Sequence, residues 1–218
     1  MKKIIIFDLD GTLLDTLNDL QTAVNFALSQ YNYPLRSLEQ VRKDIGNGVA
    51  KLMERSTPNG LLNENYEKLL EIFKEYYGSH YNVFTHAYDG MLDVVKELKK
   101  DGYIVTVATN KIIDVAKELL DIHYPEQFDY IQGDAVNVHK KPHPDMINNI
   151  VSHYGIDEKD ALYVGDTNVD EESALNGGVD YVLVTYGYRT KEEIKNSCVC
   201  TNLVDTPKEL LEYIRKTI

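Results

Sequence analysis

The sequence predicts an α/β protein built on a doubly wound parallel sheet, with an all-helical segment inserted into it. Short apolar, β-branched segments alternate with stretches of helical periodicity along most of the chain. Between residues 16 and 81 this alternation stops and only helical periodicity remains. The 218 residues, of which 43% are hydrophobic and 27% charged, are enough for one core of ordinary size or for one core with a small companion.

Five segments are predicted strands because they are short, apolar and rich in β-branched residues. They comprise residues 4–9, 103–109, 128–132, 161–164 and 181–185. Helical stripes lie between most of them, for example Met91, Val94, Val95 and Leu98. Ligand and catalytic sites of such sheets form at the carboxyl ends of the strands. The polar residues that follow each strand are therefore the candidates for function.

The stretch from residue 16 to residue 81 is predicted to be a separate helical domain. Asp15 is expected to cap a helix whose apolar face includes Leu17, Leu20 and Val24. Further helices are expected over residues 38–45, 49–56 and 63–77. Because this block is too long for a plain crossover, we expect a core of residues 1–15 and 82–218 and a helical domain of residues 16–81.

Two aspartates, Asp8 and Asp10, follow the first and most apolar strand. Side chains alternate along a strand, so these two carboxylates should point the same way. Placed together at the mouth of an apolar core, they repel each other and lose solvation. A helix cap needs only one aspartate, whereas a divalent cation would relieve both costs. Oxygen ligands of this kind suit Mg²⁺.

Polar residues also follow the second predicted strand and a later proline-rich loop. Thr109 and Asn110 deliver a hydroxyl and an amide to the strand end, although alone such a pair is more typical of a helix cap. Lys141 precedes Pro142, so its ammonium is held on a stiffened loop. A cation held in this way could bind a phosphoryl group or neutralise clustered carboxylates.

The fourth predicted strand runs into Gly165 and Asp166, and a helix is expected to start near Asn168. Acidic residues in a first helical turn are ordinary partners of the helix dipole. Asp166 precedes that turn, however, and Asp170 lies within it. With the two aspartates of the first strand, they could form an oxygen-rich magnesium site.

Other potential metal ligands are weaker candidates. His139 and His143 have the spacing of helical metal ligands, but the prolines of the loop exclude that helix. Solvent-exposed histidines are the better interpretation. Cys198 and Cys200 cannot complete a four-ligand zinc site without further ligands, so we expect reduced, structurally incidental thiols.

Taken together, these motifs resemble those of the haloacid dehalogenase superfamily. The run Asp8-Leu9-Asp10-Gly11-Thr12 is similar to the first motif, Thr109 to the second, Lys141 to the third, and the run from Gly165 to Asp170 to the fourth. The resemblance covers nearly the whole chain and implies a Rossmann-like core with a helical cap inserted after the first motif. Because dehalogenases and phosphonate-cleaving members lack an acid at the position of Asp10, this chain is more similar to phosphoryl-transfer members. Residues 46–48 and 185–189 look most like those of phosphoglycolate phosphatases.

The resemblance also implies a role for each matching residue. Asp8 would attack phosphorus to form an aspartyl-phosphate, and Asp10 would act as general acid and then general base. Mg²⁺ would be the cofactor. The implied catalytic residues are Asp8, Asp10, Thr109 and Lys141; the substrate-binding residues are Gly11, Thr12, Thr109, Asn110 and Lys141; and the metal ligands are Asp8, Asp10, Asp166 and Asp170.

The resulting prediction is a magnesium-dependent phosphatase for a small, phosphoglycolate-like monoester. Alternatives within the superfamily are a sugar-phosphate mutase similar to β-phosphoglucomutase, or a pyrophosphatase. A catalytically silent phosphate-binding regulatory protein is a further alternative. The helical domain lacks the basic motif expected of a mutase. Its basic residues Arg42, Lys43, Lys51 and Arg55 could contact a substrate carboxylate or could equally be solvated.

The net charge of the chain limits the classes of partner that it can bind. A formal net charge of -12 opposes binding to nucleic acid or anionic lipid, and no stretch approaches the length of a membrane span. We therefore expect a cytoplasmic monomer or homodimer whose partner is a small phosphorylated metabolite.

Overall fold

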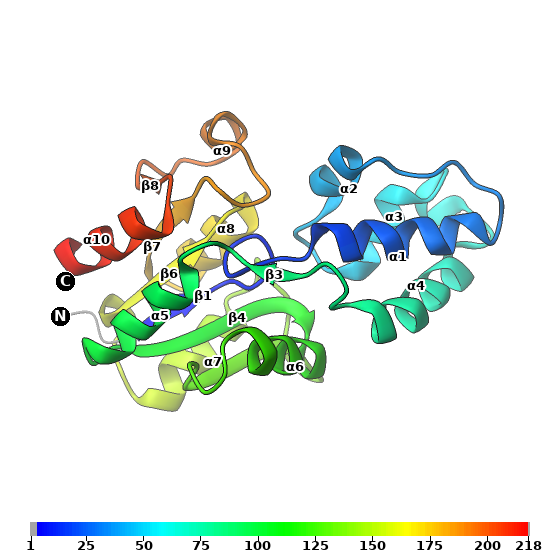
Figure 1. The fold of residues 1–218 in the computed structure, drawn as a ribbon. Helices are drawn as coiled ribbons and strands as arrows, with labels where there is room; N and C mark the ends of the chain where they lie inside the picture. Colours follow the sequence, from blue (N-terminus) through cyan, green and yellow to red (C-terminus); the bar gives the residue numbers. More distant parts are fainter. Residues whose placement is uncertain (1–3, 218) are drawn as a thin grey trace. The chain divides into compact units, whose positions relative to one another are not determined.

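The computed structural model describes residues 4–217 and divides the chain into two compact units (Figure 1). Unit 1 comprises the chain up to Leu14 and from Ala87 onward, and unit 2 comprises Asp15–His86. Residues 1–3 and 218, which the predicted core includes, lie outside the described residues. The predicted roles of a catalytic core and a cap remain proposals and are treated below.

Unit 1 alternates strands with helices. Its strands are β1 (Ile4–Phe7), β4 (Ile104–Ile112), β5 (Tyr130–Asp134), β6 (Ala161–Gly165), β7 (Asp180–Val184) and β8 (Leu203–Val204). Its helices are α5 (Met91–Lys100), α6 (Ile113–His123), α7 (Asp145–Tyr154), α8 (Asn168–Asn176), α9 (Lys191–Ser197) and α10 (Pro207–Thr217), with a short 3-10 turn, η2 (Glu158–Asp160), before β6.

The strands of unit 1 form one six-stranded sheet in the order β5-β4-β1-β6-β7-β8. Every neighbouring pair of strands in it is parallel. The most apolar strand, β1, is central and wholly buried, with β4 on one side and β6 on the other. The predicted fold class is confirmed, and the five predicted strands all lie in this sheet.

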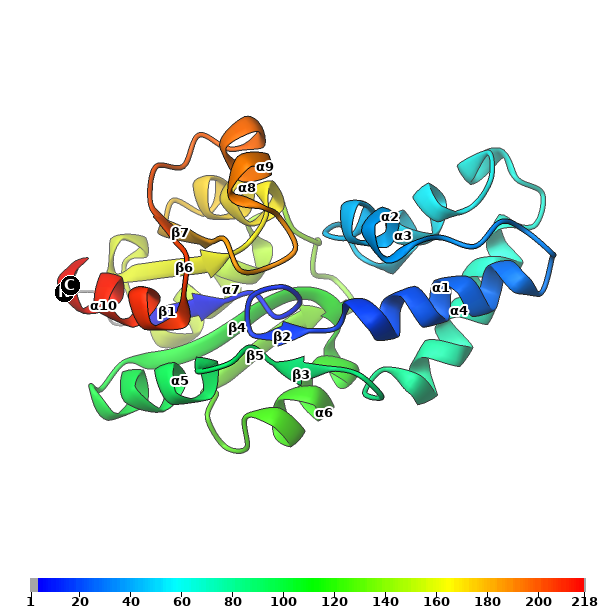
Figure 2. The ribbon, with the colours of Figure 1, turned by 45° about the horizontal axis from the view of Figure 1, so that its top comes forward.

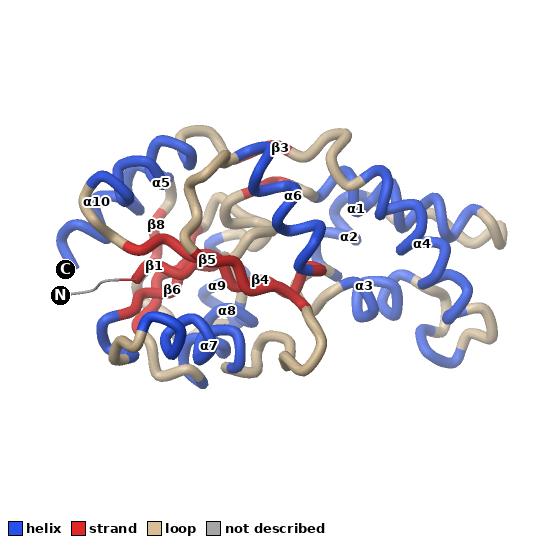
Figure 3. The backbone as a smooth tube through the Cα atoms, turned by 90° about the horizontal axis from the view of Figure 1, so that it is seen from below, coloured by secondary structure: helices blue, strands red, loops and turns tan. Residues whose placement is uncertain are grey.

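Helices cover both faces of the sheet, as a doubly wound fold requires. Figure 3 shows α5, α6 and α10 on one side of the strands and α7 and α8 on the other. On the second side, Met146, Ile147 and Ile150 of α7 pack with Ile4 and Ile6 of β1 in one apolar cluster. Alternate side chains of a buried strand face opposite layers, so β1 needs apolar residues at every position.

Unit 2 is helical and contains α1 (Leu17–Ser29), α2 (Leu38–Asp44), α3 (Val49–Ser56), η1 (Gly60–Leu62) and α4 (Tyr66–His80). Ser37 begins α2 through a capping box in which Gln40 reaches back to the cap. The sequence predicted Asp15 as the cap of α1, but the cap residue is Thr16. The Asp15 carboxylate nevertheless accepts the Leu17 N–H at 3.0 Å, so it still satisfies a free donor of the first turn.

The chain passes between the units in two short strands, β2 (Leu14–Asp15) and β3 (His86–Ala87), which pair with each other. Next to them, the Tyr88 N–H donates to the Leu13 carbonyl at 3.2 Å. Across residues 4–217, no helix combines the length and the apolar character needed to cross a membrane.

Candidate active site

The predicted site residues of unit 1 gather at the carboxyl edge of the sheet, where β1 and β6 end on the same side (Figure 2). Asp8 directly follows β1, and its backbone N–H donates to the Val164 carbonyl of β6 at 2.8 Å. This bond continues the strand pairing by one residue. It fixes the backbone of Asp8 at the end of the central strand.

Lys141 joins two of the predicted aspartates. Its Nζ lies 2.7 Å from an Asp8 carboxylate oxygen and 2.8 Å from Asp170 Oδ1. It also donates to the Tyr163 hydroxyl at 2.9 Å, so each of its three N–H donors has a buried acceptor. Tyr163 was not predicted, because a tyrosine within a buried strand is indistinguishable from an ordinary core residue in the sequence.

Asn110 positions the backbone of Lys141. The Lys141 N–H donates to Asn110 Oδ1 at 2.7 Å, and the Asn110 amide donates to the Lys141 carbonyl at 3.1 Å. This reciprocal pair ties β4 to the proline-rich loop across 31 positions of the sequence. The oxygen and the nitrogen of the Asn110 side-chain amide therefore both form hydrogen bonds with the Lys141 backbone. Its predicted contact with substrate stays a prediction.

Asp170 is held by donors on both of its carboxylate oxygens. Oδ1 accepts from Lys141 and from the Tyr163 hydroxyl, the latter at 3.1 Å. Oδ2 accepts the N–H of Asp166 at 3.2 Å and both the N–H and the hydroxyl of Thr167. Asp170 thus caps the start of α8 while fixing Lys141. If Asp170 also binds a metal ion, the ion would share a carboxylate oxygen with these hydrogen-bond donors.

Asp166 lies in a crowded, fully buried position. It accepts the Tyr188 N–H at 2.7 Å and the Thr12 hydroxyl at 3.4 Å. Gly11 has a φ of 89°, and a Cβ there would lie 2.4 Å from Asp166 Oδ2. At Gly187 a Cβ would lie 2.2 Å from the Gly11 carbonyl oxygen. Only glycine fits at these two positions, so the turn after β1 and the loop after β7 close directly around Asp166.

The backbone N–H groups of Gly11 and Thr12 form hydrogen bonds within the turn that follows β1. The Gly11 N–H donates to the Leu14 carbonyl at 2.9 Å, and the Thr12 N–H donates to the Leu9 carbonyl at 3.3 Å. Thr12 is fully buried. The structure places both residues beside Asp166, and their predicted contact with substrate stays a prediction.

Asp10 has a buried cationic partner that was not predicted. Lys111 Nζ lies 3.0 Å and 3.3 Å from the two oxygens of Asp10, and only 5% of the Lys111 side chain is exposed. The strand predicted to end at Thr109 continues to Ile112, with a shift of register between Ala108 and Ile112. Residues two apart on a strand face the same side. Thr109 and Lys111 are further linked, because the Lys111 N–H donates to Thr109 Oγ1 at 3.2 Å.

Burial dominates the electrostatics of the aspartates. Loss of solvation, opposed by Lys141 and reinforced by Asp170, raises the pKa of Asp8 to about 7. Loss of solvation and the charges of Asp170 and Asp8 also raise the pKa of Asp166. Although burial acts against it, the pKa of Lys141 is raised by Asp170 and Asp8, so the ammonium persists at neutral pH. Burial likewise opposes the charge of Asp170, but Lys141 lowers its pKa overall.

The donor set fits a divalent cation that prefers oxygen. Asp8, Asp166 and Asp170 each offer a carboxylate oxygen, and these atoms lie within 4.8 Å of one another. Burial is the main cause of the raised pKa values of Asp8 and Asp166, and Lys141 does not fully offset the cost of ionising these two carboxylates. A bound cation would complete that compensation, and an all-oxygen set suits Mg²⁺.

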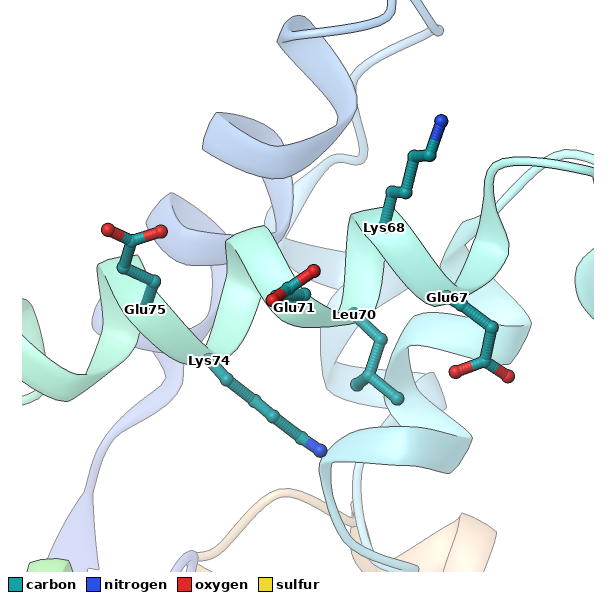
Figure 4. Close-up of a pocket in the computed structure, with 6 residues that line it drawn as sticks. All are labelled: Glu67, Lys68, Leu70, Glu71, Lys74 and Glu75. Carbon is teal, nitrogen blue, oxygen red and sulfur yellow. The ribbon is translucent and has the colours of Figure 1, made fainter.

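Unit 2 has an open depression along α4 that does not have the character of an active site. Its lining residues are Glu67, Lys68, Leu70, Glu71, Lys74 and Glu75. Figure 4 shows that all six side chains leave the same helix, with Lys68 and Glu75 directed to one side and Glu67 and Leu70 to the other. They do not converge on a common point, so this depression is a feature of the helix surface.

The four basic residues of unit 2 that the sequence singled out, Arg42, Lys43, Lys51 and Arg55, contact neighbours in that unit. Arg42 and Lys43 pair with Glu39, and Lys51 pairs with Glu54. Arg55 donates to the Asp44 carbonyl at 2.7 Å and to Asn47 Oδ1 at 2.9 Å, which orders the loop of residues 46–48. Both interpretations of these residues, as contacts of a substrate carboxylate and as solvated positions, stay predictions.

Comparison with known proteins identifies similar chains. A family model described as haloacid dehalogenase-like hydrolase matches residues 5–184. Phosphoglycolate phosphatase 1 of Pseudomonas aeruginosa is 33% identical over 217 residues, which cover 97% of this chain and 79% of that protein. The phosphoglycolate phosphatase of Vibrio parahaemolyticus is 33% identical over 220 residues, covering 97% of this chain and 96% of that protein.

A solved structure gives the same result. The crystal structure of a predicted phosphoglycolate phosphatase from Haemophilus somnus 129PT superposes with a TM-score of 0.90 at 30% identity, covering 98% of each chain. These matches confirm the family resemblance that the four motifs indicated.

Proposed function

The chain belongs to the haloacid dehalogenase-like hydrolase family and is a phosphoric monoester hydrolase, and from this premise we propose that Asp8 and Asp10 divide the hydrolysis of a small phosphate ester between them. The proposed substrate class is phosphoglycolate-like, an ester of phosphate with a small hydroxy acid, because the relatives named above are phosphoglycolate phosphatases. The observation that carries the proposal is the buried Asp8 carboxylate at the end of the central strand, in contact with the Lys141 ammonium.

Asp8 is the proposed nucleophile. One of its carboxylate oxygens attacks phosphorus, the bond from phosphorus to the ester oxygen breaks, and an aspartyl-phosphate forms. The nucleophile must be ionised, and the adjacent ammonium of Lys141 favours that state against the effect of burial. Backbone pairing with β6 fixes the position from which Asp8 attacks.

Asp10 is the proposed acid and base. It protonates the departing alkoxide, then takes a proton from the water that attacks the aspartyl-phosphate. That second attack breaks the bond between phosphorus and Asp8, releases inorganic phosphate and regenerates the carboxylate. Lys111 holds Asp10 through contacts with both of its oxygens, so the carboxylate does not turn away from its position.

Lys141 and Thr109 are proposed to stabilise the phosphoryl oxygens in the transition state. Lys141 lies beside the attacking carboxylate, and Asp170 and Asn110 fix its side chain and its backbone. Thr109 accepts the Lys111 N–H through Oγ1, which leaves the hydroxyl proton of Thr109 to donate to a phosphoryl oxygen.

We propose Mg²⁺ as the cofactor, held by Asp8 and Asp166 and by the backbone carbonyl of Asp10. When bound, it would neutralise charge on the carboxylates and on the phosphoryl oxygens. Asp170 is proposed to contribute through its hold on Lys141 and through a shared carboxylate oxygen.

Unit 2 is proposed to serve as the helical cap that selects the leaving group. Four of its basic residues, Arg42, Lys43, Lys51 and Arg55, have partners within the unit, and contact of any of them with a substrate carboxylate stays a prediction. The predicted cytoplasmic location and the predicted state of monomer or homodimer stay predictions.

The covalent mechanism is tested by Asp8→Asn, with Asp89→Asn as the control at an exposed aspartate of the same unit. With Mg²⁺ and radiolabelled substrate, acid-quenched single turnovers should leave label on the wild-type protein and on Asp89→Asn. Asp8→Asn should carry no label and should lose roughly 1,000-fold or more in kcat. Substantial turnover by a folded Asp8→Asn protein would contradict the mechanism.

The substrate class is tested separately by product analysis with a panel of phosphorylated metabolites. We expect phosphoglycolate to give the highest kcat/KM and free inorganic phosphate to be the product from every ester. Conversion of a hexose 1-phosphate into an isomeric sugar phosphate would instead identify a mutase. Release of phosphate with phosphoglycolate ranked low would leave the phosphatase mechanism intact and remove the proposed substrate.

A further inference from the structure

His139 and His143 lie on the loop that carries Lys141, and the structure brings them together with Asp145 at the start of α7. His139 Nδ1 lies 2.6 Å from Asp145 Oδ2, and His143 Nδ1 lies 2.9 Å from Asp145 Oδ1. The two imidazole rings are 4.4 Å apart between centroids. The sequence indicated that prolines exclude the helix that would place these histidines on one face. The turn of the loop brings them together without a helix.

We propose that His139, His143 and Asp145 form a surface site for a divalent transition metal of the Zn²⁺ type, separate from the acidic cluster at Asp8. Two nitrogens and one carboxylate oxygen lie within 4.8 Å of one another. In a tetrahedral zinc site, ligand atoms are about 3.3 Å apart, because the bonds are about 2.0–2.1 Å long. Rotation of the three side chains, with each Nδ1 unprotonated, would bring the ligand atoms to that spacing.

Backbone hydrogen bonds order the loop that carries the two histidines. The His139 N–H donates to Asp145 Oδ2 at 2.9 Å, and the His143 N–H donates to the Lys140 carbonyl at 2.9 Å. Pro142 and Pro144 restrict the chain between the ligands. A site that is ordered in advance loses less conformational entropy when it binds its ion.

The site is open to solvent on the side where an ion would enter. The side chains of His139 and His143 are 74% and 49% exposed, and that of Asp145 is 27% exposed. An open depression beside them is lined by both histidines and by Pro142, Pro144, Lys140 and Asn176. Three protein ligands facing open solvent leave a fourth position for water, as in zinc sites that bind an exogenous ligand.

The charges around the site are compatible with a cation. Lys140 is the neighbouring ammonium, and it pairs with Asp134 at 2.7 Å, which offsets its repulsion. Asp145 supplies the negative charge among the three ligands. Imidazole selects Zn²⁺ and similar ions over Mg²⁺. The acidic cluster at Asp8, which has oxygen donors only, has the opposite preference.

The test uses the whole chain without a histidine tag, in excess Mg²⁺ so that the acidic cluster is occupied. Zn²⁺ binding is measured by calorimetry, and Co²⁺ serves as a spectroscopic probe because a nitrogen-ligated tetrahedral site gives visible absorption. The variants are His139→Gln, His143→Gln and Asp145→Asn. His153→Gln, an exposed histidine on the same α7, is the matched control.

We expect one Zn²⁺ per wild-type chain in addition to any at the acidic cluster, and the same for His153→Gln. The His139→Gln and His143→Gln proteins should bind it roughly 100-fold more weakly and lose the Co²⁺ absorption, since each lacks one of three ligands. Asp145→Asn keeps an oxygen acceptor for the His139 N–H and should weaken binding without loosening the loop. Equal Zn²⁺ binding by the wild type and the histidine variants, or no Zn²⁺ binding beyond that of the acidic cluster, would overturn the proposal.

Discussion

Lys111 is a buried cation in contact with the proposed acid of the reaction. Its Nζ approaches both oxygens of Asp10, and its backbone N–H is bonded to Thr109. A buried lysine held in this way restricts the carboxylate it contacts, because rotation of Asp10 would break the contacts of both its oxygens with the Lys111 ammonium. We infer that Lys111 positions Asp10 for proton transfer.

This inference predicts a leaving-group dependence. In Lys111→Met, kcat for an alkyl phosphate should fall roughly 10–100-fold, because a misplaced acid protonates the alkoxide poorly. The loss should be much smaller for p-nitrophenyl phosphate, whose leaving group departs without a proton. Steady-state kcat and KM for both esters provide the measurement.

The control for Lys111 is Lys100→Met, which removes an exposed lysine of α5. It should leave both substrates unaffected. Equal losses on the two esters in Lys111→Met would contradict a role in proton transfer and would indicate a general disturbance of the site.

At the scale of elements, Asp19 ties α1 to the segment through which the chain leaves unit 2. Only 2% of Asp19 is exposed. Its carboxylate accepts the N–H groups of Val83, Phe84 and Thr85 at distances between 2.8 and 3.1 Å, and the Thr85 hydroxyl at 2.7 Å. One buried carboxylate therefore satisfies three backbone donors that no helix or sheet of this segment satisfies.

We predict that Asp19→Ala lowers the free energy of unfolding of unit 2 by about 2–4 kcal/mol, since it removes the acceptor of three backbone N–H groups and of the buried Thr85 hydroxyl. Hydrogen exchange should accelerate at the amides of Val83, Phe84 and Thr85 before it does elsewhere. Asp93→Ala, at an exposed first-turn aspartate of α5, is the control and should change neither quantity. Unchanged exchange at those three amides would show that Asp19 does not hold this segment.

A comparison of the predicted and observed helices and strands shows which parts of the fold can be predicted from sequence. The central strands were predicted because they are short, apolar and β-branched, and the helices of unit 2 because they have helical periodicity. The helix α8 was predicted from the turns on either side of it, and all these elements lie where expected. The strands β2, β3 and β8 have two residues each, too few to show a period. The extension of β4 past Thr109 was missed because it includes a register shift and polar residues.

The candidate site was predictable to the extent that its residues follow strands. Asp8, Asp10 and Asp166 stand at strand ends, where a doubly wound sheet collects polar groups. The contact of Lys111 with Asp10 spans 101 positions of the sequence, and the contact of Lys141 with Tyr163 spans 22. Such pairs depend on the packed sheet, and no local pattern in the sequence contains them.

For the whole molecule, the buried carboxylates couple stability to pH. Burial is the main cause that raises the pKa of Asp8 from its ordinary value of 3.8 to about 7, and it also raises the pKa of Asp166. Between about pH 4 and about pH 7 the folded chain retains a proton on Asp8 that the unfolded chain has lost. Stability from this group is therefore complete below about pH 4 and is lost as the pH rises through about 7.

A cation bound at these carboxylates would reverse that loss, which gives a prediction for the melting temperature. At high pH the ion would bind carboxylates that are already ionised and destabilising, whereas at lower pH it would have to displace protons. We predict that excess Mg²⁺ raises the Tm of the wild type by several degrees at about pH 8 and by much less at about pH 6. Asp89→Asn should behave like the wild type, and Asp8→Asn should show little Mg²⁺ effect at either pH. A Mg²⁺ shift that is as large at pH 6 as at pH 8 would show that the ion does not bind at Asp8 and Asp166.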